Sequence, residues 1–278
     1  MLTRYILLVI ATLSLQFAQA ETLVAGSVHA CTLSDNLSDN SVKCWGWNGF
    51  GQINVPSNLK NPRLISAGGE HSCVLENDGV KCWGNNRFGQ TDAPSDLNKP
   101  HAIFCGASHT CALDNDGIKC WGWNWFNQTT VPANLKNPRT VSAGSLHTCA
   151  IDDSGVKCWG ANDYGQSDVP TDLKNPRVIS AGGEHTCALD DNGVRCWGED
   201  SSGQSSALPK LKTPRALAAG IWHSCALDDE GVKCWGDNGF GQVTVPTTLK
   251  NPRAIAAGGW HTCALDDEGV KCWGNKLN

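Results

Sequence analysis

The sequence contains little charge and no cluster of basic residues. Only 18 % of its 278 residues are charged, and the formal net charge is −5. Because a nucleic-acid-binding protein needs a dense group of Lys and Arg side chains to contact phosphates, this class is excluded. The hydrophobic fraction of 40 % is also too high for a disordered chain. We therefore expect a folded protein that binds no nucleic acid.

Motifs for catalysis, for cofactors and for helices are missing as well. The sequence has no G-x-S-x-G, no metal-ligand triad and no phosphate-binding loop. We therefore expect no catalytic residues, no metal and no cofactor, and the chain is not expected to be an enzyme. Gly or Pro interrupts every stretch long enough for a helix, so the fold is predicted to be all-β.

The single long hydrophobic run lies at the N-terminus. It extends from Tyr5 to Phe17, follows Arg4 and precedes an A-x-A cleavage pattern at residues 18–20. The run is too short for a membrane span, which needs about 20 apolar residues. Residues 1–20 are therefore predicted to be a secretory signal peptide, and no membrane span is expected. The remaining chain is predicted to be secreted or periplasmic.

The rest of the sequence is a repeat. The phrase RAIAAGGWHTCALDDEGVKCWG, residues 253–274, occurs in seven versions, spaced 38 residues apart except for a first step of 42. Each version reads as three short strands, which in the last version are residues 254–257, 261–265 and 270–273, with a four-residue turn at 266–269. Units of this size with three antiparallel strands usually close into a ring. We predict a seven-bladed β-propeller with three-stranded blades over residues 21–278, and a monomer.

Fourteen of the 15 cysteines form one pair in each repeat. If Leu265 faces Val270 across the turn, Cys263 and Cys272 lie directly opposite each other, where a disulfide fits. Metal binding is the alternative, but zinc sites favour cysteines two to four residues apart. Cys105 is left over and is expected to be a small buried thiol. The predicted disulfides are Cys31–Cys44, Cys73–Cys82, Cys111–Cys120, Cys149–Cys158, Cys187–Cys196, Cys225–Cys234 and Cys263–Cys272.

The repeated pattern AxAGxxHTCALxxxGVxCWGxNxxGQ resembles the regulator of chromosome condensation repeat over all of residues 21–278. This resemblance implies a propeller, and it suggests nucleotide exchange on a small GTPase by analogy with the nuclear members. The 38-residue step is more similar to the secreted β-lactamase-inhibitory protein II branch, which has three-stranded blades. That similarity implies a protein partner bound by the loops at one end of the ring.

The alternation of strand direction predicts which loops share an end of the ring. The turn before each repeated histidine and the loop after each Cys-Trp-Gly lie on one face, and the Asp-rich hairpin turns lie on the other. Seven of the 12 Trp recur in Cys-Trp-Gly and are predicted to be core wedges between blades. The other five all fall in loops of the first face, where Trp47, Trp222 and Trp260 are expected to form one contiguous arc, because the first repeat lies next to the seventh once the ring closes. The predicted partner-binding residues are Trp47, Glu70, Trp123, Trp125, Leu146, Glu184, Trp222 and Trp260.

Several alternatives remain at this stage. The five loop Trp could be scattered surface aromatics or local loop packing rather than a binding surface. The face could bind another protein, with inhibition of an enzyme as one form of this function, or it could bind a glycan or cell surface, because Trp also stacks on sugars. The repeated histidines are expected to make a structural hydrogen bond in each blade. The Asp-rich turns could bind calcium weakly or act as ordinary solvated turns.

Overall fold

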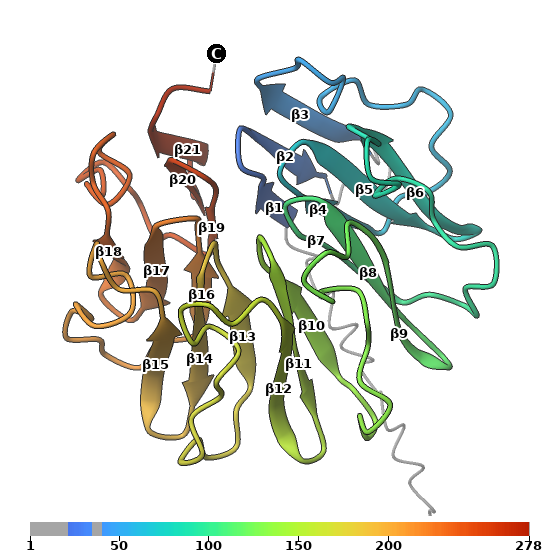
Figure 1. Ribbon diagram of the computed structural model, residues 1–278. Coiled ribbons are helices and arrows are strands. Elements are labelled where there is room, and N and C mark those ends of the chain that lie inside the picture. The colour runs from blue at the N-terminus through green and yellow to red at the C-terminus, as the bar shows by residue number, and fades with distance from the viewer. Residues whose placement is uncertain (1–21, 35–40, 278) are drawn as a thin grey trace, which may run out of the picture.

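The computed structural model describes residues 22–34 and 41–277. In these residues, 21 strands form seven antiparallel three-stranded sheets, which are arranged as blades around one axis (Figure 1). The strands nearest the axis are β1 (Thr22–Ala25), β4 (Leu64–Ala67), β7 (Ala102–Cys105), β10 (Thr140–Ala143), β13 (Val178–Ala181), β16 (Ala216–Ala219) and β19 (Ala254–Ala257). The middle strands are β2 (His29–Leu33), β5 (His71–Glu76), β8 (His109–Asp114), β11 (His147–Asp152), β14 (His185–Asp190), β17 (His223–Asp228) and β20 (His261–Asp266). The outer strands are β3 (Val42–Gly46), β6 (Gly79–Gly84), β9 (Gly117–Gly122), β12 (Gly155–Gly160), β15 (Gly193–Gly198), β18 (Gly231–Gly236) and β21 (Gly269–Gly274).

The predicted strand register is confirmed. Cys263 pairs with Cys272 and Leu265 pairs with Val270 across the β20–β21 ladder. The same register recurs in the other blades, and all seven predicted disulfides are formed, one in each blade. The seven-bladed propeller predicted from the repeat is therefore the observed fold.

The hairpin between the middle and outer strands is tighter than predicted. Instead of a four-residue link, Asp266 and Gly269 still pair with each other, and Asp267 and Glu268 alone form the turn. Gly269 has a φ of 112°, a conformation that L side chains rarely adopt. The Asp266 carboxylate accepts a 2.8 Å hydrogen bond from the backbone N–H of Glu268. This bond holds the turn closed and explains why the strands extend further than their hydrophobic pattern indicated.

The hydrophobic core lies between neighbouring blades rather than within each one. Trp83 of the second blade packs with Cys31 and Leu33 of the first blade in one buried cluster. Its indole Nε1 donates a 2.9 Å hydrogen bond to the carbonyl oxygen of Gln52 in the connector between the two blades. The prediction that the Cys-Trp-Gly tryptophans are wedges between blades is thereby confirmed for this seam, and five further seam tryptophans make the same bond.

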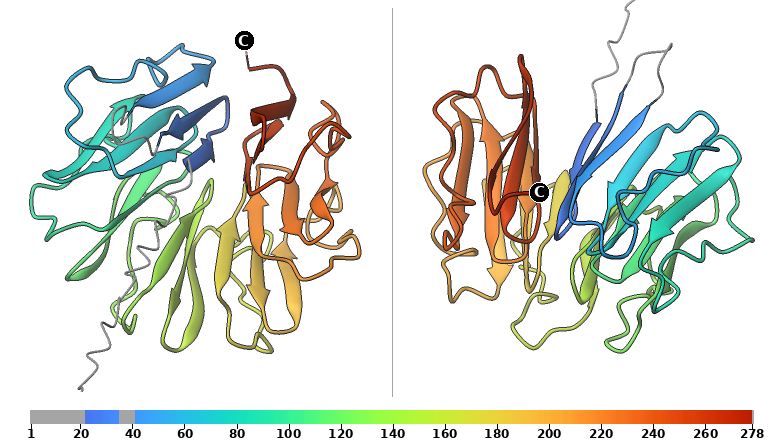
Figure 2. Two further views of the ribbon diagram at one scale, coloured as in Figure 1. Left: turned by 180° about the vertical axis from the view of Figure 1, so that it is seen from behind. Right: turned by 90° about the horizontal axis from the view of Figure 1, so that it is seen from above.

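The ring closes by packing between the first and last blades, without a shared strand. Leu23 and Ala30 lie in one buried cluster with Ala256 and Leu265. Close to the axis, the backbone N–H of Gly259 donates to the Ser27 carbonyl oxygen at 3.1 Å, and similar bonds link the other neighbouring blades. Figure 2 shows the first and seventh blades side by side at this closing seam.

The predicted signal peptide, residues 1–20, lies outside the described residues. Among the residues that the structure does describe, no helix has the length and apolar character needed to cross a membrane.

Candidate functional site: an aromatic face of the propeller

The two variable loops of each blade meet on one face of the ring, as predicted. In every blade, the residue after Cys-Trp-Gly donates its backbone N–H to the carbonyl oxygen of the residue before the histidine, over 2.8–3.0 Å. Both variable positions of a blade are therefore held together by one bond. The seven pairs are Trp47–Val28, Asn85–Glu70, Trp123–Ser108, Ala161–Leu146, Glu199–Glu184, Asp237–Trp222 and Asn275–Trp260.

Every large hydrophobic side chain that is exposed in the described residues lies in the loops after Cys-Trp-Gly. Trp125 is the most exposed, at 83 %. The complete set is Trp47, Phe50, Phe88, Trp125, Phe126, Tyr164 and Phe240. We call this end of the propeller, formed by the turns before the histidines and the loops after Cys-Trp-Gly, the aromatic face. Such a concentration of exposed aromatic side chains on one surface is typical of an interaction site.

Five of these residues were not predicted from the sequence: Phe50, Phe88, Phe126, Tyr164 and Phe240. Each stands two positions before the glutamine of the connector, and only the fifth connector has a serine there. The sequence does contain a signal that could have identified them, namely an aromatic residue that recurs at the same loop position. A buried glutamine fixes each one, because its Oε1 accepts the backbone N–H of the aromatic residue at 2.9–3.0 Å. These aromatic side chains are therefore presented by an ordered loop.

Most aromatic side chains of this face fall into two groups, and Tyr164 belongs to neither. In the larger one, the Trp123 ring stacks on Phe88 at 5.4 Å and contacts Trp125 at 6.0 Å and Phe126 at 5.8 Å. Trp123 itself is half-buried in the centre of this group. Trp123 therefore fits the alternative of local loop packing, which the sequence left open. The Trp125 side chain, by contrast, is exposed to solvent.

The second group lies where the seventh blade meets the first. Trp47 packs edge-on against Phe50 at 5.5 Å, and Trp260 packs against Phe240 at 6.4 Å. Trp47, Trp260 and Glu70 line one pocket of about 420 Å³, together with Ser27, Val28, His261 and residues 275–277. We call it the seam pocket. The structure thus brings three of the predicted partner-binding residues together, but Trp222 does not line this pocket.

The remaining predicted site residues lie elsewhere on the aromatic face. Leu146, Glu184 and Trp222 are half-buried in the turns of the fourth, fifth and sixth blades. The pKa of Glu184 is raised, first by burial and then by the negative charges of Glu199 and Asp163. The loops of the fourth and fifth blades therefore bring several negative charges together near Glu184.

The repeated histidines link neighbouring blades, which confirms their predicted structural role. In six blades, Nε2 lies 2.7–2.9 Å from a Ser or Thr hydroxyl of the next blade, which in turn donates to the glutamine carbonyl of the connector. Because this hydroxyl proton is already used, Nε2 is the donor in the first bond. Burial lowers the histidine pKa values to about 3 or 4, so the rings are neutral at pH 7.

Cys105 is half-buried beside the axis. Its thiol donates to the Ser66 carbonyl oxygen at 3.6 Å, and burial raises its pKa to about 12. Its sulfur lies close to His71 and to the sulfur of Cys73. Since Cys73 is bonded to Cys82, it offers no thiolate, and these three residues do not form a metal site.

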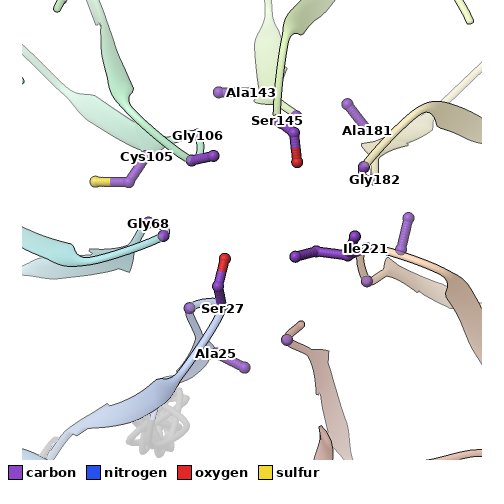
Figure 3. A pocket seen from close by; sticks show the side chains of 18 of the residues that line it. Ala25, Ser27, Gly68, Cys105, Gly106, Ala143, Ser145, Ala181, Gly182 and Ile221 are labelled. Carbon is purple, nitrogen blue, oxygen red and sulfur yellow. The ribbon is translucent and has the colours of Figure 1, made fainter. Parts of the chain in front are cut away.

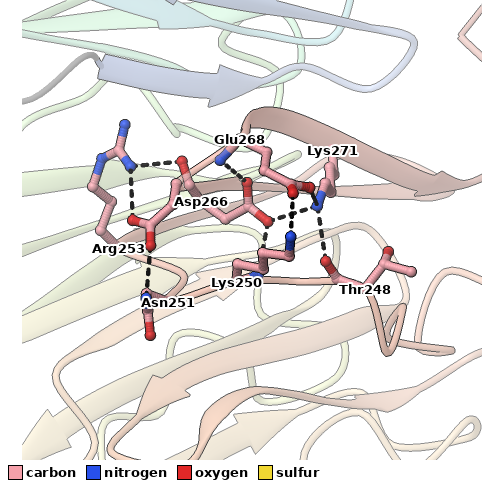
Figure 4. A network of polar contacts seen from close by, with 8 residues as sticks. Thr248, Lys250, Asn251, Arg253, Asp266, Glu268 and Lys271 are labelled. Carbon is pink, nitrogen blue, oxygen red and sulfur yellow. Dashed lines mark hydrogen bonds and ion pairs between the residues drawn. The ribbon is translucent and has the colours of Figure 1, made fainter.

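The opposite face is polar, and its acidic turns are satisfied internally. In the last blade, the Asp266 carboxylate accepts the backbone N–H of Lys250 at 2.9 Å and pairs with the Lys271 ammonium at 2.9 Å (Figure 4). The guanidinium of Arg253 donates to the Asp266 carbonyl oxygen. The hydrogen bonds that the carboxylate accepts from Lys250, Lys271 and Glu268 lower the pKa of Asp266 to about 2. The carboxylate therefore stabilises the hairpin, in keeping with ordinary turn chemistry.

The axis of the ring is lined by small residues and encloses little space. Its cavity measures about 70 Å³, room for a few water molecules. In Figure 3 the side chains of Ser27, Ser145 and Ile221 point into this opening, and the thiol of Cys105 points away from it. Glycines are required here because a Cβ at Gly68 would lie 2.4 Å from the Gly106 carbonyl oxygen. The axis is thus a tight packing element, and the aromatic face is the candidate functional site.

Solved structures with the same fold include two receptor ectodomains of plants. The ectodomain of the Physcomitrella patens receptor kinase CR4 aligns with a TM-score of 0.76 and 25 % identity, over 91 % of this chain and 72 % of that chain. The CRINKLY WD40 ectodomain of the Arabidopsis thaliana receptor kinase ACR4 gives 0.74 and 26 %, over 91 % and 97 %. The seven disulfides and these ectodomain relatives together point to an extracellular location.

Prp20p from Saccharomyces cerevisiae shares the fold with a TM-score of 0.69 and 18 % identity, over 92 % of this chain and 82 % of that chain. A comparison with curated protein sequences gave no significant match. The sequence profile of the regulator of chromosome condensation (RCC1) repeat matches six segments, which make up more than half of the chain: residues 63–90, 101–128, 139–166, 177–204, 215–242 and 253–276. The chain therefore belongs to the RCC1 repeat family.

Proposed function

We propose that this chain is an extracellular binding protein that acts as a monomer and recognises another protein through its aromatic face. The observation that carries the proposal is the confinement of all exposed large hydrophobic side chains of the described residues to that face. Aromatic side chains, Trp and Tyr above all, contribute most to binding energy at protein interfaces. No catalytic role is proposed for this face.

A protein partner suits this surface better than a small molecule. The aromatic residues are spread over loops of most blades, which matches the roughly 800 Å² per partner of a standard protein interface. One structural relative, Prp20p, is described with its binding to Gsp1p and histones, and the same protein, also called yeast RCC1, was solved bound to Kap60. This relative supports protein binding as a use of the fold.

The location narrows the choice of partner. Nucleotide exchange on a small GTPase requires a cytosolic partner, so disulfide formation argues against this function. An exported enzyme, extracellular or periplasmic, is a partner that this location allows. Inhibition would follow if the aromatic face covered the entrance to the enzyme's active site. We propose inhibition as the specific form of the function to be tested first on any partner enzyme.

Differential capture from the culture medium and periplasm of the source organism tests the proposal. The bait is the oxidised protein, and the matched bait carries Trp125→Ala, Tyr164→Ala and Phe240→Ala on the aromatic face. These exposed residues should change binding without changing stability. A control bait carries Lys60→Ala, Arg195→Ala and Lys250→Ala on the opposite face, where side-chain exposure is 73 %, 51 % and 64 %.

The expected result is a protein retained by the wild type and by the control bait but lost from the aromatic-face variant. A protein lost only from the control bait would place the binding surface on the opposite face and contradict the proposal. A glycan array run with the same three proteins tests the carbohydrate alternative. The observation that favours this alternative is the exposed indole ring of Trp125, on which a sugar could stack. If the array shows glycan binding that depends on Trp125 and no protein is captured, carbohydrate binding would replace protein binding as the proposed function.

A further inference from the structure

The seam between the seventh and first blades differs from the other six. At each of those seams a histidine Nε2 bonds a hydroxyl of the next blade, but at the seventh the corresponding residue is Ala30, which has no hydroxyl. His261 is 1 % exposed, and its Nε2 has no partner among the described residues. The seam pocket lies directly at this place and includes His261 in its lining.

The walls of the seam pocket are aromatic. Trp47 of the first blade and Trp260 of the seventh both line it, and each is supported by a neighbouring phenylalanine, Phe50 and Phe240. Val28 and Leu277 add aliphatic surface. An indole face is the best aromatic surface for a cation, because its electron density is concentrated above the ring.

A carboxylate completes the pocket. Glu70 of the second blade lines it and accepts a 2.8 Å hydrogen bond from the Asn85 amide through Oε2. This bond orients the carboxylate and leaves Oε1 without a hydrogen bond in the described part of the chain. Two indoles and an oriented carboxylate are complementary to a cationic group that is planar and carries several N–H donors.

The charge of the whole aromatic face favours the same ligand. Its turns and loops carry two basic residues, Arg87 and Lys276. They carry eight acidic residues: Glu70, Asp92, Asp163, Asp168, Glu184, Glu199, Asp200 and Asp237. Lys276 lines the pocket but is exposed, so its ammonium group is solvated. His261 adds no positive charge, because burial lowers its pKa to about 4.

We infer that the seam pocket receives an arginine side chain from the basic surface of the protein partner. This inference rests on the proposed function and specifies the partner's chemistry. The guanidinium stacks on the indole walls and donates to Glu70 Oε1, while the surrounding acidic residues attract the partner's other basic groups. A partner carboxylate would be repelled by Glu70, and a neutral side chain would leave the negative charge of Glu70 uncompensated.

The test uses the oxidised protein and two small probes, N-acetyl-arginine amide and N-acetyl-citrulline amide. Citrulline has nearly the same shape as arginine but lacks the charge. Binding is followed through the indole N–H signals of Trp47 and Trp260 in a ¹H–¹⁵N spectrum, assigned with Trp→Phe variants. We expect the arginine probe to shift both signals with an affinity in the millimolar range, and the citrulline probe to bind at least tenfold more weakly.

Glu70→Gln should weaken the arginine probe at least fivefold. The matched control is Glu184→Gln, which makes the same change at the equivalent position of the fifth blade, outside the pocket, and should leave probe affinity within twofold. Equal shifts by both probes, shifts unaffected by Glu70→Gln, or no shift at 50 mM arginine probe would each overturn the inference.

The captured partner separates this inference from the proposed function. Loss of partner affinity in Glu70→Gln and on replacement of the partner's interfacial arginine supports both. A partner that depends on Trp125 and Tyr164 but is unaffected by Glu70→Gln would leave the proposed function standing and overturn the pocket assignment. A partner insensitive to every change on the aromatic face would overturn both.

Discussion

The Nε2 atom of His223 lies 2.8 Å from the Oγ1 atom of Thr262 in the next blade. Thr262 Oγ1 donates in turn to the Gln242 carbonyl oxygen at 2.9 Å, so one hydroxyl connects two blades and their connector. Both side chains are at most 1 % exposed. A buried hydroxyl that serves two partners is costly to remove, because both partners then lose a hydrogen bond while they remain buried.

Thr262→Val should therefore destabilise the protein, although it keeps the side-chain shape. We expect a loss of about 1–3 kcal/mol in the free energy of unfolding, measured by guanidinium denaturation. The comparison variant is Ala30→Ser, at the seam that lacks this hydroxyl, which should not destabilise. A Thr262→Val protein as stable as the wild type would show that the hydroxyl bridges contribute nothing to cohesion between blades.

Stability should fall as the pH is lowered from about 6.5 to 4. Burial lowers the pKa of His71 to about 3 and that of His109 to about 4, from 6.5. In this range the unfolded chain therefore binds protons that the folded chain does not, and lowering the pH favours unfolding. Above pH 6.5 both states are neutral and this contribution is fully present. Melting temperatures at pH 8, 6.5, 5 and 4 measure the effect.

The buried Asp266 carboxylate of the last hairpin titrates below this window. The pKa of Asp266 is lowered to about 2 by bonds from Lys250 and Lys271, so its contribution is lost below about pH 4. A melting temperature that stays constant between pH 6.5 and 4 would contradict the buried neutral state of the histidines.

The oxidation state should be seven disulfides and one thiol. The intact mass is expected to be 14 hydrogens below that of the fully reduced chain. Cys105 should react with iodoacetamide slowly in the folded protein, because its raised pKa leaves almost no thiolate at pH 8. After unfolding without reductant, one alkylation is expected. More than one alkylation, or disulfides between blades, would be incompatible with the observed pairing.

The wedge and loop tryptophans should respond differently to replacement. Trp235 is 4 % exposed and donates to the Gln204 carbonyl oxygen, so Trp235→Ala should cost about 3–5 kcal/mol of stability. Trp125 is 83 % exposed, and Trp125→Ala should change the melting temperature by no more than one or two degrees. Thermal melts of both variants decide the matter. Comparable destabilisation would mean that the exposed aromatics are part of the core.

The repeat made much of the fold predictable. The pairing of Cys263 with Cys272 was predictable because both lie in one hairpin. A hairpin is a local structure in which the side chains of each strand alternate between two faces. The alternation of strand direction also placed the variable loops on one face. The partner of His223 could not be predicted, since Thr262 lies 39 residues away and the contact depends on how blades pack.

The candidate site was predicted less completely. Trp47 and Trp260 were expected to be neighbours once the ring closed, and they line one pocket. Trp222 was expected to join them, but it does not line the pocket. Phe240 and its equivalents were missed because the sequence pattern does not distinguish a repeated loop aromatic that packs inward from one that is held outward.

The most direct test of the central claim is the affinity of the purified partner for two sets of single variants, measured by calorimetry at equal salt concentration. On the aromatic face the variants are Trp47→Ala, Trp125→Ala, Tyr164→Ala and Trp260→Ala. On the opposite face they are Lys60→Ala, Arg195→Ala and Lys250→Ala. We predict that at least two aromatic-face variants weaken binding by about 2 kcal/mol or more, roughly 30-fold, with melting temperatures unchanged, while the opposite-face variants stay within twofold. Affinities that fall only in the opposite-face set, or in neither set, would contradict the assignment of the aromatic face as the binding surface.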